Sequence, residues 1–82
     1  MITITYFGNL KQLQASGTET LAWSGGTTDD LLAQLRKRGP DWEQALQPGR
    51  IFKIAINQQL QHGATAVHDG DQVAILPPVT GG

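Results

Sequence analysis

The sequence contains no cysteine among its 82 residues. This absence excludes disulfide bonds, thiolate metal sites and a cysteine nucleophile, so any sulfur chemistry must use sulfur attached after translation. An excess of charge of one sign is also missing, because six basic and seven acidic residues give a net charge of −1. We therefore expect no nucleic acid among the partners of this chain.

Long apolar runs are also absent from the sequence. The longest uninterrupted aliphatic run covers residues 73–76, whereas a membrane-spanning helix needs about 20 apolar residues. The N-terminus has no basic region followed by an apolar stretch, which a signal peptide would require. We therefore expect a cytoplasmic protein with no membrane partner. Its 82 residues suffice for one domain with a core, and we expect no large internal catalytic cleft in a domain of this size.

No pattern of residues indicates a self-contained active site or a metal site. His62 and His68 are six residues apart, which does not match the helical i, i+4 spacing of zinc ligands. Asp69 and Asp71 are expected to lie in a turn, because the extended series of oxygen ligands of a calcium loop is missing. The reactive group must therefore be sought elsewhere in the chain.

Five segments have the composition of β-strands. Residues 2–7 alternate apolar and polar β-formers, so one face of this strand is expected to be buried. The other four segments are residues 18–23, 51–56, 59–61 and 72–76. Asn57 and Gln58 are expected to form a tight turn between two of these strands.

One strong helix is predicted between the second and third strands. Thr27 or Thr28 can cap its N-terminus, and the Gly-Pro pair at residues 39–40 ends it. Its apolar stripe consists of Leu31, Leu32 and Leu35. The basic cluster at residues 36–38 falls in its last turn, where cations complement the helix dipole, and we prefer this interpretation to an anion site. The order of elements, with one helix between the second and third strands, fits several small α+β folds.

The chain ends in residues 77–82, with the sequence PPVTGG. The two glycines lack a Cβ and can enter a channel too narrow for other residues. The two prolines remove backbone donors and favour extended geometry, so the last strand should stop near Leu76. Six residues reach at most about 20 Å. We therefore predict a domain over residues 1–76 and a projecting diglycine tail over residues 77–82, with a frayed terminus as the alternative.

This terminal string resembles the C-terminus of the molybdopterin synthase small subunit, a MoaD-like sulfur carrier of the ubiquitin-like β-grasp superfamily. The similarity extends over the full chain, including the first strand, the helix, the Asn57 turn and the turn before the last strand. The resemblance implies an α+β fold of the β-grasp type, with a mixed sheet of four to five strands packed on one main helix. In that topology the first and last strands pair in parallel at the centre of the sheet.

The resemblance also implies a chemistry for the C-terminal carboxyl, which as a free carboxylate is a weak nucleophile and a poor electrophile. In the family, an E1-like adenylating enzyme uses ATP to adenylate the residue corresponding to Gly82. Sulfur transfer then gives a thiocarboxylate, whose sulfur is the nucleophile. The tail enters the large subunit of molybdopterin synthase and donates sulfur to cyclic pyranopterin monophosphate, in molybdenum cofactor biosynthesis. The small subunit binds no cofactor by itself, is not catalytic alone, and forms a heterotetramer with the large subunit.

The resemblance assigns roles to individual positions. Gly82 is the acyl-adenylate and thiocarboxylate site, and Gly81 is the narrow approach to it. The guide into the partner consists of Pro77, Pro78, Val79 and Thr80. Phe7, Leu60 and Leu76 match hydrophobic docking positions. Each also has a structural interpretation, in which Phe7 caps the core, Leu60 closes a hairpin and Leu76 finishes the last strand.

Two other classes of function stay open at this point. A diglycine carrier for thiamine or another thiolation pathway would share the activation chemistry but use a different acceptor, and residues 77–80 argue against it. A ubiquitin-like modifier would join Gly82 to a lysine, and a pure interaction module would only bind a partner through its sheet. Lysine-linked adducts would indicate the modifier.

Overall fold

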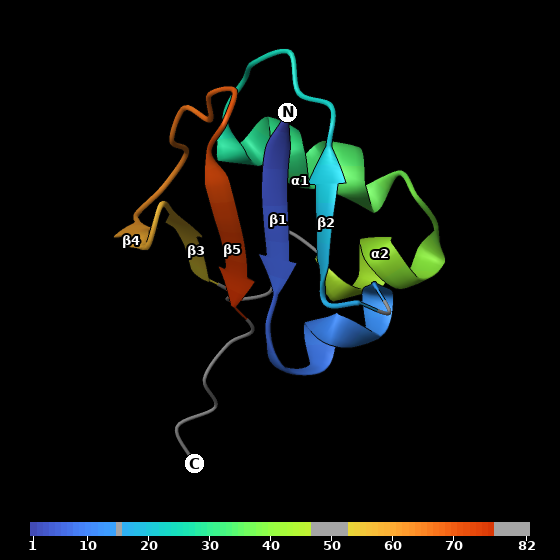
Figure 1. Ribbon diagram of the computed structural model, residues 1–82. Coiled ribbons are helices and arrows are strands. Elements are labelled where there is room, and N and C mark those ends of the chain that lie inside the picture. The colour runs from blue at the N-terminus through green and yellow to red at the C-terminus, as the bar shows by residue number, and fades with distance from the viewer. Residues whose placement is uncertain (15, 47–52, 77–82) are drawn as a thin grey trace.

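The computed structural model describes residues 1–14, 16–46 and 53–76, and Figure 1 shows their arrangement. The strands are β1 (Ile2–Tyr6), β2 (Thr18–Leu21), β3 (Lys53–Ile56), β4 (Gln59–Gln61) and β5 (Gln72–Leu76). The helices are the 3₁₀ helix η1 (Gly8–Leu13), α1 (Thr28–Arg36) and α2 (Pro40–Ala45). Within these three ranges, no helix has both the length and the hydropathy needed to cross a membrane.

The five strands form one mixed sheet in the order β2-β1-β5-β3-β4. Strands β1 and β5 are parallel, and the other neighbouring pairs are antiparallel. The prediction that the first and last strands pair in parallel at the centre is thus confirmed. Strand β2 is shorter than predicted, since it ends at Leu21, and residues 51–52 of the predicted third strand lie outside the described ranges.

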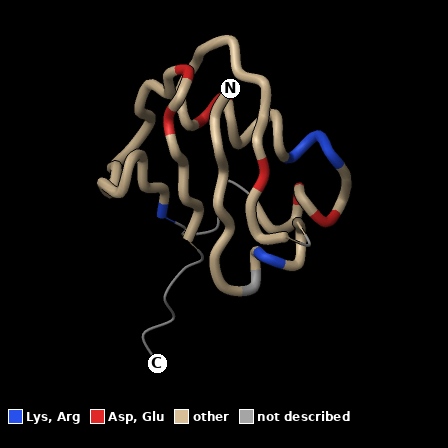
Figure 2. The backbone as a smooth tube through the Cα atoms, in the orientation of Figure 1, with Lys and Arg blue, Asp and Glu red and all other residues tan. Residues whose placement is uncertain are grey.

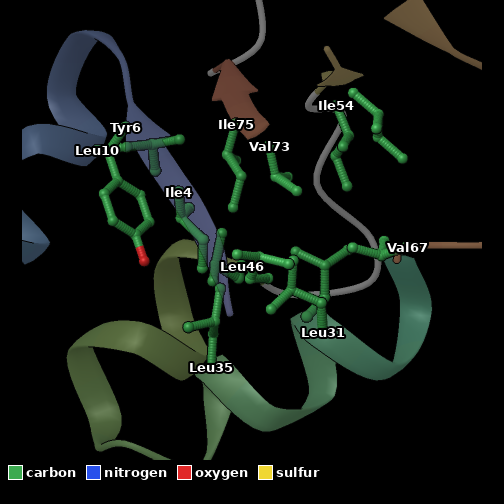
Figure 3. Packing of buried hydrophobic residues seen from close by; sticks show 13 residues of the cluster. Ile4, Tyr6, Leu10, Leu31, Leu35, Leu46, Ile54, Val67, Val73 and Ile75 are labelled. Carbon is green, nitrogen blue, oxygen red and sulfur yellow. The ribbon is translucent and has the colours of Figure 1, made fainter. Parts of the chain in front are cut away.

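The core lies between the sheet and α1 (Figure 3). Residues of β1 alternate between buried and partly exposed, as the apolar-polar period predicts, because neighbouring side chains of a strand point to opposite faces. The fully buried large side chains are Ile2, Ile4, Tyr6, Leu31, Leu35, Leu46, Val67, Val73 and Ile75. Each aliphatic side chain of this kind stabilises the fold by about 1.5–3 kcal/mol.

Helix α1 begins with a capping box at Thr27. The Thr27 hydroxyl accepts a hydrogen bond from the backbone N–H of Asp30 (3.3 Å), and the Asp30 carboxylate accepts one from the backbone N–H of Thr27 (2.9 Å). Thr28, the other candidate cap, is instead buried in the first turn, where its hydroxyl accepts a hydrogen bond from the Thr65 N–H. Thr27 is therefore the cap.

The basic cluster at residues 36–38 extends past the end of α1. Only Arg36 lies in the last turn, and Lys37 is the C-cap. The Arg38 guanidinium donates two hydrogen bonds, both 2.7 Å long, to the carboxylate of Glu19 and lies 4.7 Å from the centre of the Trp42 ring. The helix-dipole interpretation is therefore wrong for Arg38, which joins α2 to strand β2 through its side chain.

Candidate functional site at the end of strand β5

Strand β5 is held on both sides up to its last residue. Ile75 pairs with Tyr6 of β1 and with Ile54 of β3, and Leu76 pairs with Lys53. The Phe7 N–H donates to the Ile75 carbonyl (3.1 Å), which extends the β1–β5 ladder by one bond. The chain therefore leaves the domain from a strand whose end is fixed by both of its neighbours. The predicted tail, residues 77–82, lies outside the described residues.

The predicted docking residues come from three segments that the sheet brings to one face. In β5, Val73 and Ile75 point into the core, so Ala74 and Leu76 point to the opposite side, which we call the outer face. Ala74 is paired with Ala55, which is paired with Leu60. Leu60 therefore lies on the outer face too.

Phe7 continues the alternation of β1 beyond the inward-pointing Tyr6, because its backbone is extended (φ −112°, ψ 158°). It follows on the outer face, next to the end of β5. Phe7 and Leu60 are 41% and 53% exposed, so neither side chain belongs to the buried core, and Leu76 is half-buried. Their role in docking stays a prediction.

The rest of the outer face carries small or uncharged side chains with one exception. Its strand residues are Thr3, Thr5, Thr18, Thr20, Ala55, Gln72 and Ala74 in addition to Leu60 and Leu76. Lys53, opposite Leu76, is the exception among the described strand residues. Small side chains allow a partner's backbone to approach closely, and the absence of charge removes a desolvation cost. The face is therefore suited to a large contact area.

Charges differ between the two ends of the sheet (Figure 2). At the end where β5 finishes, the exposed cations are Lys53 and Lys11 of η1. At the other end, Asp69 pairs with the amino group of Met1, and Asp71 accepts hydrogen bonds from the His68 N–H and from Asn57. The bond from the His68 backbone, followed by that from Asn57, lowers the pKa of Asp71.

A polar network next to Phe7 was not predicted from the sequence. The buried Tyr6 hydroxyl donates to Glu19 (2.6 Å), which also receives both hydrogen bonds from Arg38. The bonds from Arg38 lower the pKa of Glu19, and burial raises the pKa of Tyr6. The sequence does contain one indication of this network, a tyrosine at an inward position of an alternating strand. Its hydroxyl is buried there and needs a hydrogen-bond partner.

Within the described parts of the chain, no group of three or more His, Asp or Glu residues could hold a metal ion. The tyrosine network has its hydrogen bonds satisfied internally and lies against the core, so it gives no reactive group to solvent. The site is thus an apolar surface around the end of a fixed strand.

Comparisons with known proteins agree with this description. A family model described as the ThiS family matches residues 4–82. The chain is 33% identical over 82 residues to the molybdopterin synthase sulfur carrier subunit of Haemophilus influenzae, and 32% identical over 82 residues to that of Escherichia coli, with 100% of each chain covered. It is also similar to the crystal structure of SAMP1 from Haloferax volcanii, with a TM-score of 0.77 and 24% identity, over 99% of this chain and 98% of that one. The predicted α+β fold of the ubiquitin-like β-grasp type is confirmed.

Proposed function

This chain belongs to the ThiS family, and we propose that it is the sulfur carrier subunit of a molybdopterin synthase. The observation that carries the proposal is the match over 100% of both chains to relatives that bear this name. The family model also extends to residue 82, so the diglycine end belongs to the matched region. The absence of cysteine is consistent with a carrier whose sulfur is added to its C-terminus.

In this proposal the C-terminal carboxylate of Gly82 attacks ATP in an E1-like adenylating partner, which releases pyrophosphate and leaves an acyl-adenylate. Hydrosulfide from a sulfur donor then displaces AMP, and the product is a thiocarboxylate on Gly82. Inside the large subunit of the synthase, its sulfur attacks a carbon of cyclic pyranopterin monophosphate and displaces an oxygen substituent from that carbon. Hydrolysis of the resulting thioester leaves the sulfur on the pterin and returns Gly82 to the carboxylate. Gly81 provides the narrow approach, because a side chain would widen the segment that enters the partner.

The fold supports this role by fixing the start of the tail. Because β5 is paired with β1 as far as Ile75 and with β3 as far as Leu76, the tail starts from a defined point and direction. The large subunit would contact the outer face through Phe7, Leu60 and Leu76, and residues 77–80 would guide the glycines into its pocket. A docked domain with a short tail keeps the reacting sulfur at high local concentration.

The first test is the formation of the thiocarboxylate. The purified chain is incubated with its adenylating partner, ATP and a sulfur donor, and intact and C-terminal fragment masses are measured. We expect one oxygen to be replaced by sulfur at Gly82, and alkylation to label only that position, because the chain has no cysteine. Deletion of Gly82 should abolish the change, whereas Gln44→Ala on the exposed surface of α2 should not.

The second test identifies the acceptor. The sulfur-loaded chain is mixed with the large subunit and cyclic pyranopterin monophosphate, and the formation of molybdopterin is measured. An unchanged C-terminus with an active adenylating partner would contradict the carrier function itself. A thiocarboxylate that transfers no sulfur to the pterin, but does transfer it in a thiamine thiazole assay, would instead contradict only the acceptor.

A further inference from the structure

A concave surface lies on the helix side of the sheet, away from the outer face. It is a cleft of about 440 Å³ between α1 and the β3–β4 hairpin, which is within the range of roughly 300–1,000 Å³ typical of ligand sites. We propose that this cleft binds a short extended peptide segment of a partner protein. The segment would carry a cationic and an anionic side chain on either side of an apolar one.

The wall formed by α1 determines the charges of that segment. Asp29, Leu32 and Arg36 line the cleft and follow each other at i, i+3 and i+7, so they form one stripe along the helix. Leu32 packs at the margin of the core beside Leu31 and Leu35, which are completely buried, whereas Asp29 is exposed and Arg36 half-buried. The two opposite charges are about 10 Å apart along the axis, at 1.5 Å per residue.

The floor and the facing wall suit an apolar residue between the two charges. Leu32 and Ile54 are only 5% and 9% exposed and offer carbon atoms to the cleft. Gln61 points to the helix side of the sheet, since its neighbour Leu60 points to the outer face. At Gly63, a Cβ would meet no atom within 4 Å, so this side of the entrance is open.

The position of the Arg36 charge is fixed by a hydrogen bond. Its Nε donates to the Leu46 carbonyl (2.6 Å), which holds the planar guanidinium at one end of the cleft. A side chain held in place loses less entropy on binding, and arginine is well suited to carboxylates. We therefore expect the acidic residue of the peptide at Arg36 and the basic one at Asp29.

An extended segment fits this spacing and this edge of the sheet. A strand advances about 3.3 Å per residue and its side chains alternate between two faces, so residues i, i+2 and i+4 share one face and the first and last are about 13 Å apart. The long, flexible side chains of lysine and glutamate can bridge the difference from the roughly 10 Å between the two charges of the wall. Strand β4 is the last in the order of strands, and edge strands commonly accept extended peptides. Because Leu60 and Gln61 point to opposite faces of β4, such a peptide and a partner on the outer face could bind together. The proposal does not rest on the proposed function.

The test uses blocked, fluorescent peptides with the central sequences Lys-Ser-Val-Ser-Glu, Lys-Ser-Val-Ser-Lys and Glu-Ser-Val-Ser-Glu, in which the charged residues and the valine share one face of an extended chain. They are titrated by fluorescence anisotropy against the full chain. The mixed-charge peptide should bind about fivefold more tightly than either like-charged peptide, as expected for one surface ion pair. Equal affinities for all three peptides would overturn the proposal.

A charge reversal makes the test specific to the cleft. Asp29→Lys gives the wall two positive charges, so the preference should change to Glu-Ser-Val-Ser-Glu. Glu43→Lys changes the net charge equally but lies on α2, outside the cleft, and should leave the preference as it was. A preference that does not change in the Asp29 variant, or changes in both variants, would contradict the proposal.

Mapping on the unaltered chain avoids any dependence on how a variant folds. In ¹H–¹⁵N spectra, the mixed-charge peptide should shift the amide signals of Leu32, Arg36, Gln61 and Gly63. The signals of Thr5 and Ala74, on the outer face, should stay in place. Shifts confined to the outer face would assign the peptide to the docking surface and overturn the proposal.

Discussion

At the scale of single residues, Glu19 has the largest set of polar contacts in the described structure's interior. It accepts hydrogen bonds from the Tyr6 hydroxyl and from both terminal nitrogens of Arg38, and the Glu19 side chain is only 13% exposed. A pair with this geometry and burial is worth more than an ordinary surface salt bridge. It also connects β1, β2 and the segment after α1, so its removal affects three parts of the fold.

Glu19→Gln should lower the free energy of unfolding at neutral pH by about 1–2 kcal/mol, because hydrogen bonds to a charged group are replaced by neutral ones. The variant should also be less sensitive to acid. The pKa of Glu19 is lowered from 4.5 in the folded protein, so its contribution is complete above pH 4.5 and is lost as the pH falls through the folded pKa.

Urea unfolding at a series of pH values between about 7 and 3 measures both effects. The difference in unfolding free energy between the unaltered chain and Glu19→Gln should shrink as the pH falls. Glu43→Gln, on the exposed side of α2, is the matched control and should change stability little at any pH. A constant difference across the series would show that the charge of Glu19 contributes nothing.

At the scale of elements, the hairpin of β3 and β4 has the predicted tight turn, and both residues of this turn have positive φ. Asn57 and Gln58 have φ values of 52° and 71°, and Ile56 pairs directly with Gln59. This is a two-residue loop with both residues in the left-handed region, as in a type I′ turn. Asn tolerates this region, whereas other L-residues lose about 1–2 kcal/mol there. Gln58 is therefore the strained position.

Gln58→Gly should stabilise the protein by up to about 1 kcal/mol, because glycine adopts positive φ without strain but gains freedom in the unfolded chain. Thermal unfolding of the variant and the unaltered chain measures the change. Gln59→Gly, one residue later in β4, should destabilise by about 0.5–1 kcal/mol, since that residue has strand geometry. A loss of stability in Gln58→Gly would mean that the Gln58 side chain stabilises the fold by more than its strained backbone destabilises it.

Elements were predictable from the sequence where the signal is local. The alternation in β1 and the leucine stripe of α1 are periodic, and both bury the residues expected. The cap could also have been chosen, since only Thr27 has an acid three residues later at Asp30 that completes a capping box. Contacts between distant segments gave no such signal, and the Arg38–Glu19 pair connects residues 19 positions apart.

At the scale of the whole molecule, the candidate site depends on sheet register, which the sequence determines only indirectly. The sequence predicted that the tail would follow a central strand, because the family resemblance supplied the topology. The sequence could not show whether Phe7 and Leu60 face the core. Phe7 stands at the end of its predicted strand, and the strand that contains Leu60 is only 3 residues long. The register Ala74–Ala55–Leu60 resolves it and puts the large apolar side chains on the face opposite α1.

The last prediction separates docking from folding. Leu60→Glu should weaken the complex with the synthase large subunit at least tenfold, because a carboxylate would lose its hydration in an apolar interface. The isolated domain should keep its stability within about 0.5 kcal/mol, since Leu60 is 53% exposed and lies on an edge strand. Isothermal titration calorimetry measures the affinity, and differential scanning calorimetry measures the stability.

Gln44→Glu is the matched control, because it adds the same charge at an exposed position of α2, on the helix side of the sheet. It should leave the affinity unchanged, because a partner on the outer face does not contact α2. An equal loss in both variants would mean that the added charge itself, and not its place on the outer face, weakens the complex. Unfolding of Leu60→Glu would mean that Leu60 belongs to the core. An unchanged affinity of that variant would mean that Leu60 is not part of the docking surface.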